Sequence, residues 1–257
     1  FDHPTEQCVP VAFIVLDKNL KKLGESEKVA EGERMYASRF MGDKAYLVTY
    51  RNTDPLFVLD LSVPENPKVL GELKIPGYSK YLHPLGENYL IGFGEDSIEK
   101  KYTNYDGTED VTAYATGLKL AIFDITDYEN PKELHTVKIG GRGSYSPLLY
   151  NHKSLLFKED EGLFAFPATL AENAGYYENG VPKYGDTEFE GFLVFDLSVE
   201  EGIKLRGKIS NDETKNYYQN QAKRILYIGD NLYSLFENMI KVNDKETIDE
   251  IDVIKFK

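Results

Sequence analysis

Acidic side chains are the residues of this chain whose spacing most readily suggests chemistry. The segment D-G-T-E-D places Asp106, Glu109 and Asp110 within five residues. Calcium prefers several carboxylate and carbonyl oxygens, which makes these three a candidate calcium site. The segment lacks the alternating aspartates and distal glutamate of a calcium-binding loop, however, and a solvated turn explains the same residues. We expect the turn, with calcium as the alternative and no other cofactor.

Three further aspartates, Asp60, Asp124 and Asp196, recur at matching places, each with Ser or Thr after one intervening residue. An aspartate that ends a strand before a turn caps the turn, so we interpret all three as structural. The histidines form no H-x-H or H-E-x-x-H pattern, and no G-x-S-x-G segment occurs. The single cysteine, Cys8, excludes an internal disulfide and a Cys-rich zinc site. We therefore assign no catalytic residue.

These aspartates belong to a repeated strand–turn–strand unit. Its fullest copy spans 55–77, where an apolar run, a Pro/Asn turn and an alternating run follow one another. Further copies begin at Gly117 and Gly191, with a shorter copy at 11–24 and a worn one at 239–255. A second pattern lies between the copies, namely a strand, a turn containing Gly, Asn or Asp, and a strand. It covers 36–50, 78–92, 145–158 and 221–236.

Two successive patterns make a unit of four strands, and tandem four-stranded units predict an all-β fold, the β-propeller. Two of the spacings between strand-ending positions match the roughly 40–50 residues of a blade, and two carry about 20 more. We expect about four complete blades and a partial N-terminal blade. No strands remain at the C-terminus to complete the partial blade, which suggests the C-terminal part of a larger ring. The alternative is closure with one thin blade, and an open edge would favour self-association.

The whole chain, 1–257, is thus expected to be one propeller domain. Its parts are an extension and partial blade, a plain blade, two blades with insertions, and a C-terminal blade. They span 1–33, 34–76, 77–140 with the insertion 95–116, 141–210 with the insertion 169–190, and 211–257.

Both insertions fall between the second and third strands of their blades, so we expect them to be loops side by side on one face. Long loops in a compact repeat are usually functional. Both are rich in tyrosine, acid and glycine, a composition suited to contacts with protein or sugar. The candidate contact residues are Tyr102, Tyr105, Tyr114, Tyr176, Tyr177 and Tyr184.

Charge and hydropathy argue against nucleic-acid and membrane partners. The net charge of −13 disfavours nucleic acid and anionic lipid, both of which require clustered Lys and Arg. No apolar run approaches the ~20 residues that span a bilayer, which argues against membrane insertion. The aromatic residues comprise 19 Tyr, 14 Phe and no Trp, and such rings favour strands.

The runs R-M-Y-A-S-R-F-M-G-D-K-A-Y-L-V-T-Y and D-P-L-F-V-L-D-L-S-V-P-E-N-P-K-V-L-G-E-L-K-I-P-G-Y-S-K-Y-L-H-P resemble a known family. Its members are prokaryotic secreted proteins with a C-terminal β-propeller domain distantly related to Trp-Asp repeat propellers. The resemblance implies export, a signal sequence upstream of Phe1 and further upstream blades. It brings no reaction and no catalytic residue. The absence of Trp departs from the Trp-Asp repeats themselves.

Two functions follow as expectations. The favoured one is a secreted or cell-surface module, without enzymatic activity, that binds a protein or carbohydrate through the face carrying both insertions. The alternative is an extracellular hydrolase or lyase with its site at the propeller axis. A deep pocket with convergent acids, His or Arg would favour the enzyme.

Overall fold

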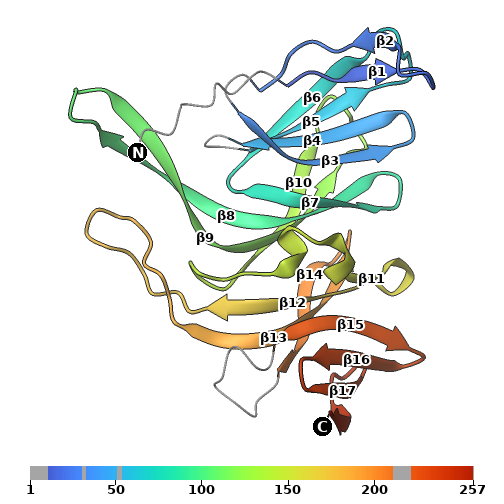
Figure 1. The fold of residues 1–257 in the computed structure, drawn as a ribbon, viewed down its shortest axis with the longest axis vertical. Helices are drawn as coiled ribbons and strands as arrows, with labels where there is room; N and C mark the ends of the chain where they lie inside the picture. The colour runs from blue at the N-terminus through green and yellow to red at the C-terminus, as the bar shows by residue number, and fades with distance from the viewer. Residues whose placement is uncertain (1–10, 31–32, 51–53, 211–220, 257) are drawn as a thin grey trace. The chain divides into compact units, whose positions relative to one another are not determined.

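The computed structural model describes residues 11–30, 33–50, 54–210 and 221–256; Cys8 lies outside these ranges. Within them the chain forms four four-stranded sheets and one two-stranded sheet (Figure 1). In each four-stranded sheet the strands are adjacent in sequence order, as expected for propeller blades. No helix in the described ranges is long and apolar enough to cross a membrane. The all-β propeller prediction is confirmed.

The chain divides into two compact units, each described by itself. The first contains residues 1–114 and 122–133, and the second contains 115–121 and 134–257. The N-terminal pair is β1 (Ile14–Leu16) and β2 (Lys22–Glu25). The next sheet contains β3 (Arg34–Met41), β4 (Lys44–Tyr50), β5 (Asp54–Asp60) and β6 (Lys68–Ile75). It is followed by β7 (Tyr78–Leu85), β8 (Tyr89–Thr103), β9 (Glu109–Asp124) and β10 (Lys132–Ile139).

The two remaining sheets both belong to the second unit. One contains β11 (Leu156–Lys158), β12 (Leu163–Ala171), β13 (Thr187–Ser198) and β14 (Gly202–Ser210). The other contains β15 (Ala222–Ile228), β16 (Asn231–Phe236), β17 (Met239–Asp244) and β18 (Glu250–Lys255). Three short 3-10 helices accompany β11, at Pro147–Leu149, His152–Ser154 and Glu159–Glu161.

The second and third strands of each blade carry the core. In β12, Leu163 to Ala168 are buried without a break, and in β13 Phe192 to Phe195 are buried as well. Continuous apolar runs are expected where both faces of a sheet are covered. Phe192 meets Phe236 of β16 edge to face, with ring centroids 5.2 Å apart. Adjacent blades of this unit thus share one hydrophobic core.

Glycines in the last strands of three sheets, β2, β6 and β14, let successive blades approach closely. A Cβ on Gly24 would lie 2.4 Å from the carbonyl oxygen of Pro64 in the next blade. A Cβ on Gly71 would lie 2.5 Å from the carbonyl oxygen of Glu129, and one on Gly207 would lie 2.8 Å from Ile248. In each case the neighbour is the turn between the third and fourth strands of the following blade. The absence of a side chain is therefore required at these positions.

Two local expectations were wrong. The excess at 95–116 is not a loop, because β8 and β9 extend to Thr103 and from Glu109 and leave only a tight turn. The hairpin expected over 145–158 is replaced by two 3-10 helices, and its second strand is β12, which lies further along the chain. Pro147 explains the second difference, since proline fits the first turn of a helix and cannot donate to a ladder.

Candidate functional site

Residues 172–186 connect β12 to β13 and contain three of the six candidate tyrosines; we call this segment the tyrosine arm. Its backbone is held by internal hydrogen bonds rather than left as an open loop. The amide of Glu172 donates to the Asp186 carbonyl over 2.9 Å, and the amide of Lys183 donates to the Gly175 carbonyl over 2.9 Å. At its tip the amide of Tyr177 donates to the Val181 carbonyl over 2.9 Å. The arm is therefore an ordered excursion from the sheet.

The arm presents its aromatic rings to solvent. Tyr176, Tyr177 and Tyr184 are 55%, 56% and 70% exposed. A recess of about 550 Å³ lies at the tip, lined by Tyr176, Tyr177, Glu178, Asn179 and Lys183.

Cations lie against two of these rings. The Lys183 ammonium is 5.4 Å from the centroid of the Tyr177 ring, and the Arg142 guanidinium is 4.1 Å from that of Tyr184. Arg142 also donates from Nη1 to the Pro182 carbonyl over 2.6 Å. These contacts fix the rings while leaving much of their surface open, which suits a binding platform.

The first insertion distributes its tyrosines differently. Its turn is closed by the amide of Asn104, which donates to the Thr108 carbonyl over 2.8 Å. Tyr105 stands fully exposed in this turn, and Tyr102 is 44% exposed with its hydroxyl donating to Asp110 over 3.1 Å. Tyr114 is only partly exposed, further down β9. The three rings are spread along the hairpin.

Of the candidate calcium residues, Asp106 lies in a solvated turn, as expected, whereas Glu109 and Asp110 begin β9. Asp106 accepts from the amide and hydroxyl of Thr108 over 3.0 and 2.6 Å, and these bonds lower the pKa of its carboxyl. Asp110 accepts from the amide of Val111, and Glu109 is exposed. Across the described ranges, no three His, Cys, Asp or Glu side chains gather closely enough to hold a metal ion. Calcium binding by these residues stays a prediction.

Two of the three repeated aspartates cap turns. Asp60 accepts from the amide of Ser62 over 3.0 Å, and Asp124 accepts from the amide of Thr126 over 2.9 Å. The Ser62 amide and then its side chain lower the pKa of Asp60, and the Thr126 side chain and then its amide lower the pKa of Asp124. Both residues are therefore structural, as expected from the sequence.

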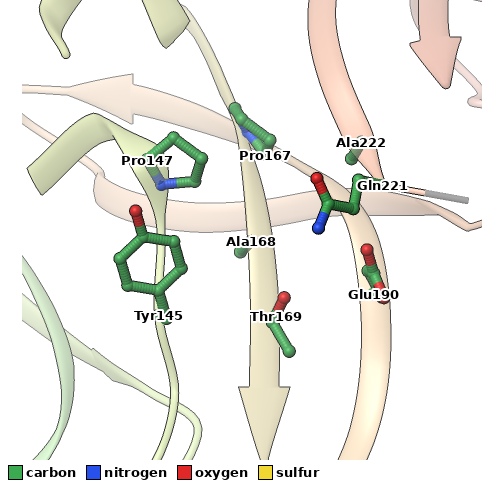
Figure 2. Close-up of a pocket in the computed structure, with 8 residues that line it drawn as sticks. All are labelled: Tyr145, Pro147, Pro167, Ala168, Thr169, Glu190, Gln221 and Ala222. Carbon is green, nitrogen blue, oxygen red and sulfur yellow. The ribbon is translucent and has the colours of Figure 1, made fainter. Parts of the chain in front are cut away.

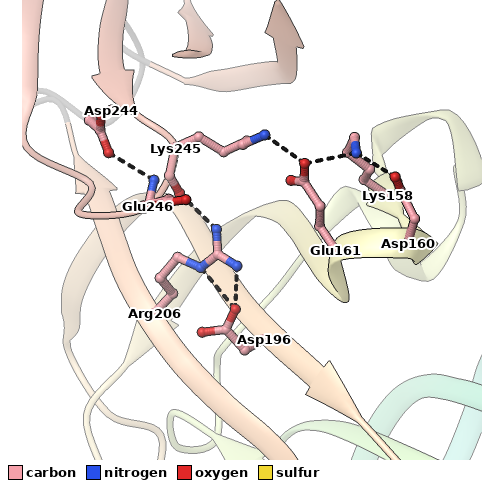
Figure 3. Close-up of polar contacts among 8 residues, drawn as sticks. All are labelled: Lys158, Asp160, Glu161, Asp196, Arg206, Asp244, Lys245 and Glu246. Carbon is pink, nitrogen blue, oxygen red and sulfur yellow. Dashed lines mark hydrogen bonds and ion pairs between the residues drawn. The ribbon is translucent and has the colours of Figure 1, made fainter. Parts of the chain in front are cut away.

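The third repeated aspartate, Asp196, makes an ion pair instead. It accepts from Nε of Arg206 over 2.9 Å, and Arg206 in turn donates from Nη1 to the Lys245 carbonyl over 2.7 Å (Figure 3). The Lys245 ammonium reaches Glu161 over 2.8 Å. This network joins turns of the last two blades, so Asp196 is also structural, although by a different contact.

Sequence reasoning missed a pocket of about 310 Å³ at the base of the tyrosine arm. Its lining residues come from β12, β13, the residues at the beginning of β15 and those at the beginning of the first 3-10 helix (Figure 2). They are Tyr145, Pro147, Pro167, Ala168, Thr169, Glu190, Gln221 and Ala222. Burial raises the pKa of the Glu190 carboxyl, and nearby Lys223 partly offsets this effect. No local motif marks these residues, because the fold brings them together from four segments.

Comparison with known proteins agrees with this architecture. An uncharacterized protein of Methanocaldococcus jannaschii is 46% identical over 154 residues, which cover 60% of this chain and 22% of that protein. One from Archaeoglobus fulgidus is 33% identical over 241 residues, which cover 94% of this chain and 31% of that protein. The chain thus spans less than a third of the length of these relatives.

Among solved structures, the β-propeller domain of Vanderwaltozyma polyspora Nup133 aligns with 99% of this chain and 76% of its own, at 9% identity and a TM-score of 0.40. At a TM-score this low, the likeness carries no weight in the assignment. The Beta propeller domain family, by contrast, matches residues 5–248. Together with four sheets of four sequential strands, this match shows that the chain belongs to the Beta propeller domain family.

Proposed function

We propose that this propeller is an exported, non-enzymatic module that binds a protein or glycan partner through its two insertions. The tyrosine arm supplies the main contact in this proposal. Export is supported by the resemblance of the strand repeats to those of secreted prokaryotic proteins. The finer claim, that binding uses the insertions, is supported by the geometry of the arm.

The observation that carries the proposal is three exposed tyrosine rings on a hydrogen-bonded arm. Folding gains nothing from leaving such large apolar faces in water, whereas a partner would bury them. Tyrosine combines a wide contact area with few rotatable bonds, so its ordering on binding costs little. Lys183 and Glu178 beside the recess add polar contacts at the rim.

The residues that line the 310 Å³ pocket give less support to catalysis. Glycoside hydrolysis usually employs two carboxyl groups across the scissile bond. Among the residues that the structure describes, the lining of the 310 Å³ pocket contains one carboxylate, Glu190, and neither histidine nor arginine. We therefore favour binding over the hydrolase or lyase alternative.

The test is a pair of variants in the intact domain. Replacing both Tyr176 and Tyr177 with alanine removes two exposed rings and leaves the arm's backbone hydrogen bonds in place. The matched control is Tyr150→Ala, since Tyr150 is 73% exposed and lies outside the arm. Binding is measured on an immobilised glycan array and by pull-down from cell-surface extract, and circular dichroism checks that each variant folds.

We expect the double variant to weaken capture at least tenfold, because aromatic contacts often dominate binding free energy. The control should bind like the unmodified domain. Equal capture by all three proteins would remove the tyrosine arm from the proposal. An equal loss of binding in the Tyr150→Ala control and the double variant would also remove the tyrosine arm from the proposal.

A further inference from the structure

The first strand of the third complete blade is interrupted, and the interruption creates the 310 Å³ pocket. Tyr145 pairs with Thr169 of β12 through two backbone hydrogen bonds of 2.8 Å. The chain then leaves the sheet through two 3-10 helices and rejoins it only where Leu156 pairs with Ala165. The edge of β12 at Pro167 and Ala168 is thereby left to line the pocket.

Two prolines and one serine stabilise this interruption. Pro167 has no amide hydrogen to donate to a neighbouring strand, so the gap leaves no unsatisfied donor there. Its carbonyl accepts from the hydroxyl of Ser146 over 2.6 Å, and Ser146 is completely buried. Ser146 also caps the helix that begins at Pro147 by accepting from the Leu148 amide over 3.2 Å. The hydrogen bonds of Ser146 therefore hold this wall of the pocket in place.

The pocket combines flat apolar surfaces with polar groups. Figure 2 shows the ring of Tyr145 on one side of Thr169 and the carboxyl of Glu190 and amide of Gln221 on the other. Two prolines and two alanines complete the lining. A volume of 310 Å³ lies at the lower end of ligand pockets, roughly 300–1,000 Å³, and matches a ligand with a single ring.

Charges around the pocket favour a neutral ligand. The partly buried carboxyl of Glu190 opposes entry of an anion. Lys223 acts on Glu190 electrostatically and donates to the Gln221 side-chain carbonyl over 3.0 Å, so a second cation would meet a positive charge. Lys223 itself is paired with Glu237 at 2.6 Å, which holds its ammonium in place. Hydroxyl groups can donate to a carboxylate without bringing net charge.

We propose that this pocket binds a neutral pyranose ring, whose hydroxyls bond to Glu190, Gln221 and Thr169 while its C–H face packs on Tyr145. The proposal is independent of the tyrosine arm as a binding platform, because none of the described residues lines both the pocket and the arm's recess. It assigns the pocket to recognition of one sugar ring and requires no bond breakage.

The test uses the whole domain and four neutral probes, the methyl glycosides of glucose, galactose, mannose and N-acetylglucosamine. Binding is followed by saturation-transfer difference NMR and titration. Glu190→Gln removes the charge at nearly constant size, and Thr169→Val removes a hydroxyl at nearly constant shape. Glu188→Gln is the matched control, since Glu188 lies on the same strand, is exposed and does not line the pocket. n-Propylammonium and acetate serve as the charged probes.

We expect at least one glycoside to bind, with affinity reduced roughly tenfold or more by Glu190→Gln and unchanged by Glu188→Gln. Absence of saturation transfer from all four glycosides would overturn the proposal. Tighter binding of n-propylammonium or acetate would overturn the neutral class. The Tyr176→Ala and Tyr177→Ala double variant should bind the glycoside normally; loss of binding there would place the sugar on the arm instead.

Discussion

Replacement of Gly71 by alanine tests whether the blades of this propeller depend on backbone-to-backbone contact. On an isolated strand this change should stabilise the protein by about 0.4–1 kcal/mol, because alanine restricts the unfolded chain more than glycine does. In the folded protein, however, the new Cβ would lie 2.5 Å from the Glu129 carbonyl oxygen and 2.6 Å from that of Tyr128. Cβ contacts below 3.0 Å essentially never occur, so the facing turn must move by about half an ångström or more.

Overpacking of this kind costs typically about 1–3 kcal/mol, and the entropic gain offsets part of that cost. We therefore expect Gly71→Ala to lower the free energy of unfolding by about 1–2 kcal/mol. Urea unfolding followed by circular dichroism measures this change. Glu72→Ala is the control, because Glu72 is exposed and its ion pair with Lys74 should contribute little. A Gly71→Ala protein as stable as the unmodified domain, or more stable, would refute the close contact between blades.

Two further predictions concern the core. Phe236→Ala should lower the free energy of unfolding by about 3–5 kcal/mol, because this buried ring packs edge to face on Phe192. Guanidinium unfolding measures the change. A loss below about 1 kcal/mol would contradict the core that the last two blades share. Burial raises the pKa of Tyr46 to about 12 from 10.0, so the folded state keeps a proton that the unfolded state releases between these values. Stability should therefore fall as pH rises through this window, by about 1.4 kcal/mol at pH 11. The Tyr46→Phe variant should lack this part of the pH dependence of stability. Equal pH dependence in the variant and the unmodified protein would argue against a raised pKa for Tyr46.

The repeat predicted most of the fold because each copy specifies its own strands. The apolar run, the turn with Pro or Asn and the alternating run at 55–75 became β5 and β6, and the copies at 117–139 and 191–210 became the matching strands. Gly42, Gly86 and Gly229 occupy turns with positive φ, which the pattern of Gly, Asn and Asp predicted. Strands and their connecting turns can therefore be predicted from a few consecutive residues wherever those residues determine the turn.

The insertions show where this reasoning fails. In the first, Asp106 and Gly107 are a hairpin signal, and Gly107 does adopt a φ of +84° in a tight turn. The charged residues around them concealed the strands, because a hairpin that extends beyond the core has no buried face to impose alternation. The pocket at Glu190 was beyond sequence reasoning for another reason. Its polar groups are separated by up to 52 residues along the chain, from Thr169 to Gln221, and only strand pairing brings them together.

One departure from the repeat shows that the blades are matched in pairs. Where β2, β6 and β14 carry Gly24, Gly71 and Gly207, which leave no room for a side chain, β10 carries the large residue His135. The facing turn of the next blade is changed correspondingly: it carries Gly202, and a Cβ there would lie 3.1 Å from the His135 ring. His135 also bonds to the Val199 carbonyl over 2.7 Å through Nε2. The larger side chain of His135 thus fills the space that Gly202 leaves in the facing turn, as close packing requires. At this interface the departure from the repeat is therefore compensated by the facing turn.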